Sequence, residues 1–406
     1  MTDQPATAPD NDMPIGPLLM ARGLRDFGDG FVAVLLPVHL LAIGLTPLQV
    51  GIVSSAALLG ASLMTLLVGV VGAHHDRRQL LLVAACLMAA TGLASSVTQT
   101  YAVLLLVAFV GTINPSGGSV SVFVPLEHAV LAQAAKAHMR TKLFARYSLI
   151  GALAGAFGAL AAGSPDLLAR AGVDQNTAIR GMFGLYAALG VAGYLIYRRI
   201  PKRPPPVGEK APMGLGPSRG IVVRLAMLFS LDSFAGGFVV QSLLALWLFQ
   251  RFDMSLAAAS LFFFWSGVLS AFSFPVAAWL SRRIGLINTM VWTHIPSSLC
   301  LIAAAFAPSL PVALGLLLVR SALSQMDVPT RSSYVMAVVT EGERTAAASF
   351  TAVPRSLAAA ISPSLAGAML GGTVLIWPFL ICGVLKISYD ILLLAQFRHI
   401  RPPEES

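Results

Sequence analysis

Long segments almost free of charge are the feature that most limits how this chain can fold. Four of the clearest are Leu80–Val97, Tyr101–Val110, Ile221–Phe249 and Ser255–Leu280. A helix needs about 20 apolar residues to cross about 30 Å of hydrocarbon, and several segments reach that length. Only 11% of the 406 residues are charged, against roughly 25% in a soluble domain. A large core in water would need helices with polar outer faces, which most of these segments lack. The sequence therefore predicts an all-α polytopic membrane protein.

Loop signals divide the chain into twelve predicted spans. They lie near residues 17–43, 47–72, 79–97, 101–134, 142–163, 179–198, 220–249, 254–280, 286–306, 312–339, 345–370 and 376–397. Most loop lysines and arginines fall on the side that holds the N-terminus, whereas the opposite loops carry only Arg170, Arg180 and Arg251. Cytoplasmic loops are the basic ones, so we expect both termini in the cytoplasm. The net charge of +9 then reflects topology, and we expect no nucleic-acid partner.

The middle of the chain separates two halves. Residues 199–219 are rich in proline and basic side chains, a composition typical of a linker rather than a packed core. The predicted organisation is a cytoplasmic tail (1–16), an N-terminal six-helix bundle (17–198), a cytoplasmic linker (199–219), a C-terminal six-helix bundle (220–397) and a short cytoplasmic tail (398–406). The first tail lacks the basic start of a signal peptide, so we expect the first span to stay in the membrane.

No motif indicates a cofactor, a metal or a catalytic centre. Cys86, Cys300 and Cys382 each stand alone in a different apolar run, without the spacing of a disulfide framework or a metal site. No phosphate-binding loop is present, which argues against ATP-driven transport. The membrane histidines, among them His39 and His294, are scattered over different spans and lie outside any hydrolase or zinc motif. We therefore expect no cofactor, no metal and no enzyme activity.

The two halves repeat each other weakly. When the second half is laid on the first, Pro125 falls on Pro329 and Arg140–Thr141 falls on Arg344–Thr345. Further matches follow in the same order, which chance explains less well than any single match. Two parallel repeats of six spans place a binding site between the halves, near mid-membrane, and permit rocking about it.

The loop after the second span carries a recognisable motif. It reads Gly72-Ala-His-His-Asp76-Arg77-Arg78-Gln79. Together with the repeat, this loop resembles the signature of the major facilitator superfamily, Gly-x-x-x-Asp-Arg/Lys-x-Gly-Arg/Lys, although Gln79 replaces the second glycine. The resemblance implies twelve transmembrane helices in two six-helix pseudo-repeats, a monomer, and a cytoplasmic gate motif of Gly72, Asp76 and Arg77. An ordinary basic loop that obeys topology is the alternative.

In this superfamily, spans 1, 4, 7 and 10 line the central cavity, and here they hold most of the intramembrane charge. An ionisable residue near mid-bilayer costs at least about 2.5 kcal/mol, so each needs a partner or a function. In span 1, Arg22, Arg25, Asp26 and Asp29 fall on one helical face, and the pairs four residues apart can neutralise each other. One interpretation is a self-satisfied ladder of charges. The other is a proton-coupling site at Asp29 or Asp26, with Arg25 in the cavity.

Span 4 is interrupted by Asn114–Gly118, which reads Asn-Pro-Ser-Gly-Gly. The interruption falls close to mid-membrane. Non-helical backbone at that depth is tolerated only against protein or a water-filled cavity, so Asn114 is a cavity candidate. Glu127 follows toward the cytoplasm as a further proton-coupling candidate. The adjacent His128 points away and is predicted to pack or to gate.

Span 7 carries Asp232, a proton-coupling candidate, and Gln241, a cavity candidate. In span 12, Lys386 and Asp390 are four residues apart on a helix that is peripheral in the superfamily. Residues at this spacing are neighbours on a helix, so we expect a structural ion pair there.

Span 10 carries the most ordered polar stripe, with Arg320, Asp327, Arg331 and Tyr334 near one face. This stripe has two interpretations. Asp327 and Arg331 form an ion pair that only stabilises the half, or the stripe coordinates substrate or protons. Asp327 is therefore a proton-coupling candidate, and the other three are cavity candidates. Arg355 in span 11 is a further cavity candidate, a buried cation without a local partner.

Span 5 contains Gly151, Gly155, Gly158 and Gly163 at near-helical spacing. Small residues let membrane helices approach closely. The spacing loosely resembles the glycine-rich fifth helix of drug/proton antiporters in the superfamily, although the Gly-Pro step of that motif is absent.

The sequence favours a secondary active transporter of a bacterial inner membrane, coupled to protons and working by alternating access. Its expected partners are a small-molecule substrate, protons and the lipid bilayer. Proton-coupled efflux by an antiporter is the first interpretation, and uptake by proton symport is the second. Arg320, Arg331 and Arg355 indicate an anionic group on the substrate. A membrane sensor would normally add a soluble output segment, and an intramembrane enzyme would need an oriented nucleophile, so both are disfavoured.

Overall fold

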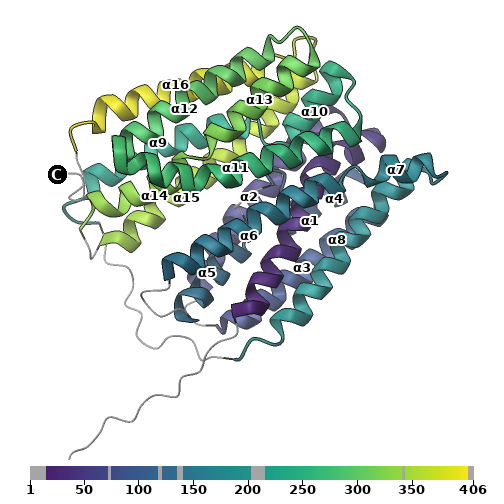
Figure 1. Cartoon of the computed structure of the whole chain (residues 1–406). Coiled ribbons are helices and arrows are strands. Elements are labelled where there is room, and N and C mark those ends of the chain that lie inside the picture. Colours follow the sequence, from purple (N-terminus) through teal and green to yellow (C-terminus); the bar gives the residue numbers. More distant parts are fainter. Residues whose placement is uncertain are drawn as a thin grey trace, which may run out of the picture.

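The computed structural model describes residues 15–71, 75–117, 121–134, 140–202, 215–340 and 343–400. These residues form sixteen helices and no strand (Figure 1). Most of the predicted linker and tails lies outside the described residues. Among the described residues, nine helical segments are long and apolar enough to cross a membrane. The all-α polytopic fold predicted from the apolar runs is therefore confirmed.

The helices follow the predicted spans in order. Their bounds are α1 Ile15–Ala42, α2 Pro47–Val71, α3 Arg77–Val97, α4 Tyr101–Val110, α5 Phe123–Ala134, α6 Arg140–Ala161, α7 Ser164–Arg170, α8 Gln175–Tyr197, α9 Arg219–Gly237, α10 Gln241–Phe252, α11 Leu256–Ile284, α12 Leu286–Ala305, α13 Leu310–Ser324, α14 Asp327–Val338, α15 Arg344–Leu370 and α16 Trp377–Phe397. Three spans are each built from two helices, namely α4 with α5, α9 with α10, and α13 with α14. The short α7 lies in the connection between α6 and α8.

The large apolar side chains on the outside of the bundle fit a hydrocarbon solvent. Phe272 and Trp292 each expose 60% of their surface, and many leucines and valines on other helices are exposed too. A soluble monomer rarely exposes apolar patches of this extent.

The predicted interruption of span 4 is present between α4 and α5. The side-chain oxygen of Asn114 accepts hydrogen bonds from the amide (3.1 Å) and hydroxyl (2.6 Å) of Ser116, which closes the turn. Gly117 follows with φ +59°, a conformation that favours glycine. The carbonyl of Pro115 accepts a hydrogen bond from the amide of Ser242 (3.0 Å), at the start of α10. The breaks in spans 4 and 7 therefore meet each other.

Helices α1–α8 and α9–α16 form two neighbouring groups, drawn purple to teal and green to yellow in Figure 1. Within the first group, α1 packs on α6 and α8, and α3 packs on α8. Within the second, α9 packs on α15, and α12 packs on α13 and α16. The groups meet mainly along α2 with α15 and along α6 with α11. At the first of these seams, Gly51 and Gly367 face each other so closely that a Cβ on either would clash.

The glycines of span 5 allow the close helix approach that their spacing predicted, and the structure shows that the partner of α6 is α1. A Cβ at Gly30 would clash with the carbonyl oxygen of Gly155, and a Cβ at Gly158 would clash with that of Phe27. This reciprocal contact between two backbones fixes the height at which the charges of α1 lie beside α6.

We expect Gly30→Ala to destabilise the protein by about 1–3 kcal/mol, because the added methyl forces two backbones apart. Gly184→Ala in α8 is the matched control, since a Cβ there meets no atom within 4 Å, and we expect its effect to stay within about 0.5 kcal/mol. Unfolding of the purified variants in detergent, followed by tryptophan fluorescence, measures both. Equal effects of the two substitutions would contradict the close approach.

Hydrogen bonds join the two halves at the end of the molecule away from the start of α1 and the end of α16. The hydroxyls of Ser54 and Ser242 lie 3.3 Å apart, and the hydroxyl of Ser364 donates to that of Ser55 at 2.6 Å. At the same end, the carboxylate of Asp166 in α7 accepts from the amide of Ala257 in α11 at 2.9 Å. Figure 1 shows α7 and α10 at this end, opposite the end of α16.

Candidate functional site

Glu127 lies at the centre of the first group of buried charges. Its side chain is fully buried and accepts hydrogen bonds from Arg25 (2.8 Å), from the hydroxyl of Tyr197 (2.6 Å) and from that of Tyr147. The guanidinium of Arg25 also stacks over the ring of Phe123, 4.7 Å from its centroid. Three donors and an aromatic face therefore hold an ion pair between α1 and α5 inside the bundle.

The ladder predicted for span 1 forms only in part. Arg22 pairs with Asp26 at 2.7 Å, as its spacing suggested. Arg25 does not pair with Asp29; it turns to Glu127 and also lies 3.4 Å from Asp26. The spacing along one helix identified the available partners, but α5 offers Arg25 a better one.

Asp29 has a different environment from the other acids of this group. It is 4% exposed, and its carboxylate accepts a hydrogen bond from the hydroxyl of Tyr186 at 3.0 Å. That hydroxyl also lies 3.1 Å from the backbone oxygen of Thr112, beside the break in span 4. Within the described part of the chain, no ion pair to Asp29 is found.

The balance of charge in this group is uneven. We call Arg22, Arg25, Asp26, Asp29 and Glu127 the N-terminal charge cluster. It contains three carboxyl groups and two guanidinium groups, so it carries one net negative charge when all are ionised. Buried charge is costly unless it is paired. One added proton makes the cluster neutral.

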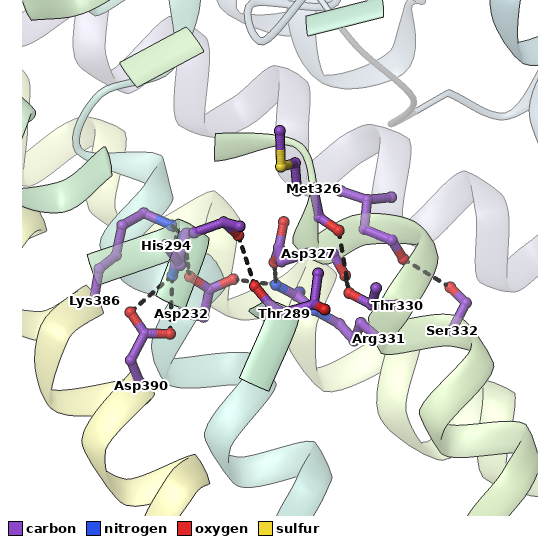
Figure 2. Close-up of polar contacts among 12 residues, drawn as sticks. Asp232, Thr289, His294, Met326, Asp327, Thr330, Arg331, Ser332, Lys386 and Asp390 are labelled. Atoms are coloured by element: carbon purple, nitrogen blue, oxygen red, sulfur yellow. Dashed lines mark hydrogen bonds and ion pairs between the residues drawn. The ribbon is translucent and has the colours of Figure 1, made fainter. Parts of the chain in front are cut away.

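A second group of buried charges lies in the other half (Figure 2). The carboxylate of Asp232 in α9 accepts from Arg331 in α14 at 2.7 Å and from Lys386 in α16 at 2.7 Å. Arg331 also pairs with Asp327, one turn away in α14. The Asp327–Arg331 ion pair predicted from the spacing is thus present, and Asp232 extends it to two further helices.

The structural pair predicted between Lys386 and Asp390 is replaced by partners on other helices. Lys386 points to Asp232, while Asp390 lies 3.0 Å from Nδ1 of His294 in α12. The other ring nitrogen of His294 lies 3.3 Å from the Lys386 ammonium. We call Asp232, His294, Asp327, Arg331, Lys386 and Asp390 the C-terminal charge cluster. Sequence reasoning set His294 aside; the available signal was a histidine deep in a span together with acids on other spans.

The remaining cavity candidates lie in different surroundings. Arg320 and Arg355 are half-buried, and neither has an ion pair in the part of the chain that the structure describes. Tyr334 is fully buried, lies edge-on to the ring of Phe397 and donates to the carbonyl of Ile400. These three residues stay predictions as cavity residues.

The two polar residues at the broken spans lie close together. Gln241 begins α10, and its side-chain amide lies where a Cβ on Gly117 would be. Gly117 belongs to the turn that Asn114 closes. Asn114 and Gln241 therefore flank the contact between spans 4 and 7, near the boundary between the halves.

The gate motif is described only in part. Gly72 lies outside the described residues. Asp76 is the N-cap of α3 and accepts a hydrogen bond from the amide of Arg78. The guanidinium of Arg77 donates to the carbonyl of Ala129 in α5 at 3.2 Å. In this structure the motif thus ties the start of α3 to α5 within the first half.

Glu343 is a further anchored acid that sequence reasoning missed. It lies in the connection between α14 and α15 and accepts from the hydroxyls of Ser218 and Thr340, each at 2.6 Å, and from the amide of Gly216. These hydrogen bonds, led by the one from Ser218, lower its pKa to about 2. They fasten the residues before α9 to the start of α15.

The described residues contain no group of three or more His, Cys, Asp or Glu side chains that could hold a metal ion. The described helices hold two clusters of paired buried charges, one in each half. Their chemistry is suited to binding and releasing protons and to binding a charged solute.

Comparison with known proteins identifies the architecture. An uncharacterized membrane protein of Saccharomyces cerevisiae is 24% identical over 92% of each chain. Among solved structures, a bacterial homolog to the human lysosomal transporter Spinster, inward-facing and occupied, matches with a TM-score of 0.75 and 14% identity, covering 98% of this chain and 99% of that one. The inward open xylose transporter XylE from E. coli matches with a TM-score of 0.74 and 16% identity over 96% and 98%.

A D-xylose-proton symporter is also similar, with a TM-score of 0.72 and 16% identity over 96% of this chain and 98% of that one. The model of the Major Facilitator Superfamily matches residues 18–319 and 226–406, which together cover nearly the whole chain. The chain belongs to the Major Facilitator Superfamily and is a secondary transporter.

Proposed function

We propose that this transporter is coupled to protons and that Asp29 carries the coupling proton during alternating access. The observation that carries the proposal is the environment of Asp29. It is a buried acid that accepts from a tyrosine hydroxyl, whereas Asp26 and Glu127 beside it are ion-paired. Because the N-terminal charge cluster is neutral with one added proton, the acid without an ion pair is the one that holds it.

The contacts between the halves support a state that is open toward the start of α1 and the end of α16. Ser54, Ser55 and Asp166 close the opposite end through hydrogen bonds to the second half. The positive-inside rule assigns the termini to the cytoplasm, so the closed end faces outward. In the proposed cycle, Asp29 releases its proton to the cytoplasm from this state. It is reloaded after the halves rock to the opposite opening.

Proton-coupled export of a small molecule from the cytoplasm of a bacterial cell is our first proposal for direction. Its support is the glycine face of α6, the fifth span, against which α1 and its charges pack tightly. This face is the antiporter-like pattern of the sequence. Uptake by proton symport is the second proposal. Arg320 and Arg355, the half-buried arginines, favour an anionic solute for it, and the likeness to a D-xylose-proton symporter fits its coupling.

Membrane vesicles of defined orientation test the coupling and the direction together. Everted vesicles that contain the protein are energised by respiration, and a pH-sensitive dye follows the lumenal acidity while a panel of compounds is added. Export predicts dye recovery with particular compounds in everted vesicles, whereas uptake predicts a substrate-dependent proton influx in right-side-out vesicles. Transport of a compound without any proton movement in either orientation would contradict proton coupling.

We expect Asp29→Asn to abolish the dye response, because the asparagine side chain keeps the hydrogen bond from Tyr186 but cannot take up a proton. Asp253→Asn is the matched control. That carboxyl group is exposed at the C-cap of α10, outside the charge clusters, and the variant should still respond. A full response in Asp29→Asn would assign the proton to another acid.

A further inference from the structure

The side chains of Asp232, His294 and Lys386 meet in a triangle of polar atoms (Figure 2). One carboxylate oxygen, Oδ1 of Asp232, lies 2.7 Å from Nζ of Lys386 and 3.7 Å from Nε2 of His294. The third side, from Nζ to Nε2, measures 3.3 Å. A single acceptor oxygen therefore faces two nitrogen atoms on different helices, α16 and α12.

The neighbours of His294 define which ring nitrogen carries its proton. Nδ1 lies 3.0 and 3.1 Å from the two oxygens of Asp390, both of which accept hydrogen bonds. Nε2 faces the Lys386 ammonium, which can only donate. The pattern is satisfied by a neutral ring with its proton on Nδ1, so that Nε2 accepts from Lys386. His294 is thus ready to receive a proton at Nε2 when Lys386 moves away.

We propose that His294 is a second proton-binding residue of the transport cycle, and that its protonation transfers Asp232 from Lys386 to His294. A proton from solution binds Nε2, the hydrogen bond from Nζ to Nε2 breaks, and a hydrogen bond from Nε2 to Oδ1 of Asp232 forms. Lys386 keeps its charge and leaves the triangle, because two cations compete for one oxygen.

Lys386 is the partner that moves. Its side chain is 13% exposed, against 4% for His294. The ring of His294 is fixed by Asp390 and lies edge-on to Tyr389, with ring centroids 6.0 Å apart. A lysine side chain has four rotatable carbon–carbon bonds, whereas a histidine held at both ring nitrogens has none free.

The other titratable and charged side chains of the packed helices remain in place around the triangle. They are Asp390 and Tyr389 on α16, Asp327 and Arg331 on α14, Arg320 on α13 and Arg355 on α15. Arg331 keeps its bond to the second oxygen of Asp232 throughout. Protonation of His294 therefore replaces one hydrogen bond to Asp232. The donor changes from Lys386 on α16 to His294 on α12.

This exchange has a mechanical consequence. The half-span α9 belongs to a broken span that meets the other half, whereas α12 and α16 pack on each other behind it. A proton at His294 transfers one polar contact of α9 from α16, on which α9 packs, to α12, which packs on α16. Proton binding in the second half is thus coupled to the position of a helix at the boundary between the halves.

The test is nuclear magnetic resonance of the whole protein in lipid nanodiscs, with ¹⁵N-labelled histidine and lysine side chains. Thr293–His294 is the single Thr–His pair of the sequence, which identifies the histidine signal. At the alkaline end of a pH series we expect Nδ1 protonated and Nε2 unprotonated. On acidification Nε2 should gain a proton, and the Lys386 Nζ signal should change at the same midpoint.

Three results would overturn the proposal: a proton on Nε2 at the higher pH, a neutral ring throughout, or a Lys386 signal that ignores the protonation of His294. His39 is the internal control, since its ring packs on that of Phe183 and the described residues offer it no acidic partner. It should stay neutral across the range.

Asp390→Asn removes the carboxylate that selects the Nδ1 proton, so we expect both ring tautomers in this variant. Ser388→Ala in the same helix is its matched control and should keep the single tautomer, because the exposed hydroxyl of Ser388 donates to the carbonyl of Val384, away from His294. The proposal rests on proton-coupled transport for its role in the cycle. The measurement needs no substrate, and Asp29→Asn should leave the His294 signal unchanged. A failure of proton-coupled transport at Asp29 and a failure of the exchange at His294 can therefore be distinguished.

Discussion

Replacing Glu127 by glutamine is expected to destabilise the protein by about 3–5 kcal/mol, because it removes one partner of a buried ion pair. Arg25 is 3% exposed, and its remaining carboxylate neighbour would be Asp26 at 3.4 Å, which already pairs with Arg22. The glutamine can still accept from Tyr197, so the loss is that of the charge. Unfolding in detergent, monitored by tryptophan fluorescence, gives the change in stability.

Two comparisons separate charge from hydrogen bonding at this position. Tyr197→Phe deletes one hydrogen bond to Glu127 and should cost only about 1 kcal/mol. The double variant Arg25→Met with Glu127→Gln removes both charges and should recover most of the stability lost in the single variant. If Glu127→Gln proves as mild as Tyr197→Phe, the carboxyl group is neutral in the folded protein, and the proton assigned to Asp29 belongs to Glu127.

The spans and their breaks could be predicted because each depends on residues close together in sequence. Apolar length, loop composition and the Asn114–Gly118 interruption are local properties, and the structure places helices and a turn where they indicated. The glycines of span 5 were equally informative, because a helix face without side chains allows another helix to pack closely against it. The Arg22–Asp26 and Asp327–Arg331 pairs belong to the same class, because a single helix fixes their geometry.

Contacts between helices could not be predicted in this way. Lys386 and Asp390 have ideal spacing for a pair within α16, yet both point to other helices. The choice depends on how α16 is rotated against α9 and α12, which is decided by packing of the whole half. For the same reason Arg25 turns to Glu127, more than one hundred residues away in the chain. Charges on one face of a helix identify a site, but their partners require the fold.

A disulfide between Ser55→Cys and Ser364→Cys is expected to abolish transport, and reduction is expected to restore it. The two hydroxyl oxygens lie 2.6 Å apart across the seam between α2 and α15, so the side chains already meet. Alternating access requires this end to open, and a covalent bond of about 2 Å between sulfurs prevents that. The measurement is transport of a compound identified in the vesicle screen, before and after a reductant, in a background without Cys86, Cys300 and Cys382.

The matched control is a disulfide between Ser266→Cys and Ser321→Cys. Their hydroxyl oxygens are 2.7 Å apart, almost the same distance, but both helices, α11 and α13, belong to the second half. A bond within one rigid half leaves the rocking motion free, so transport should persist when this pair is oxidised. Inhibition by both disulfides would mean that the halves deform internally during the cycle. Inhibition by the first pair alone is the result expected of two rigid halves that rock about a site between them, so that one end of the molecule opens as the other closes.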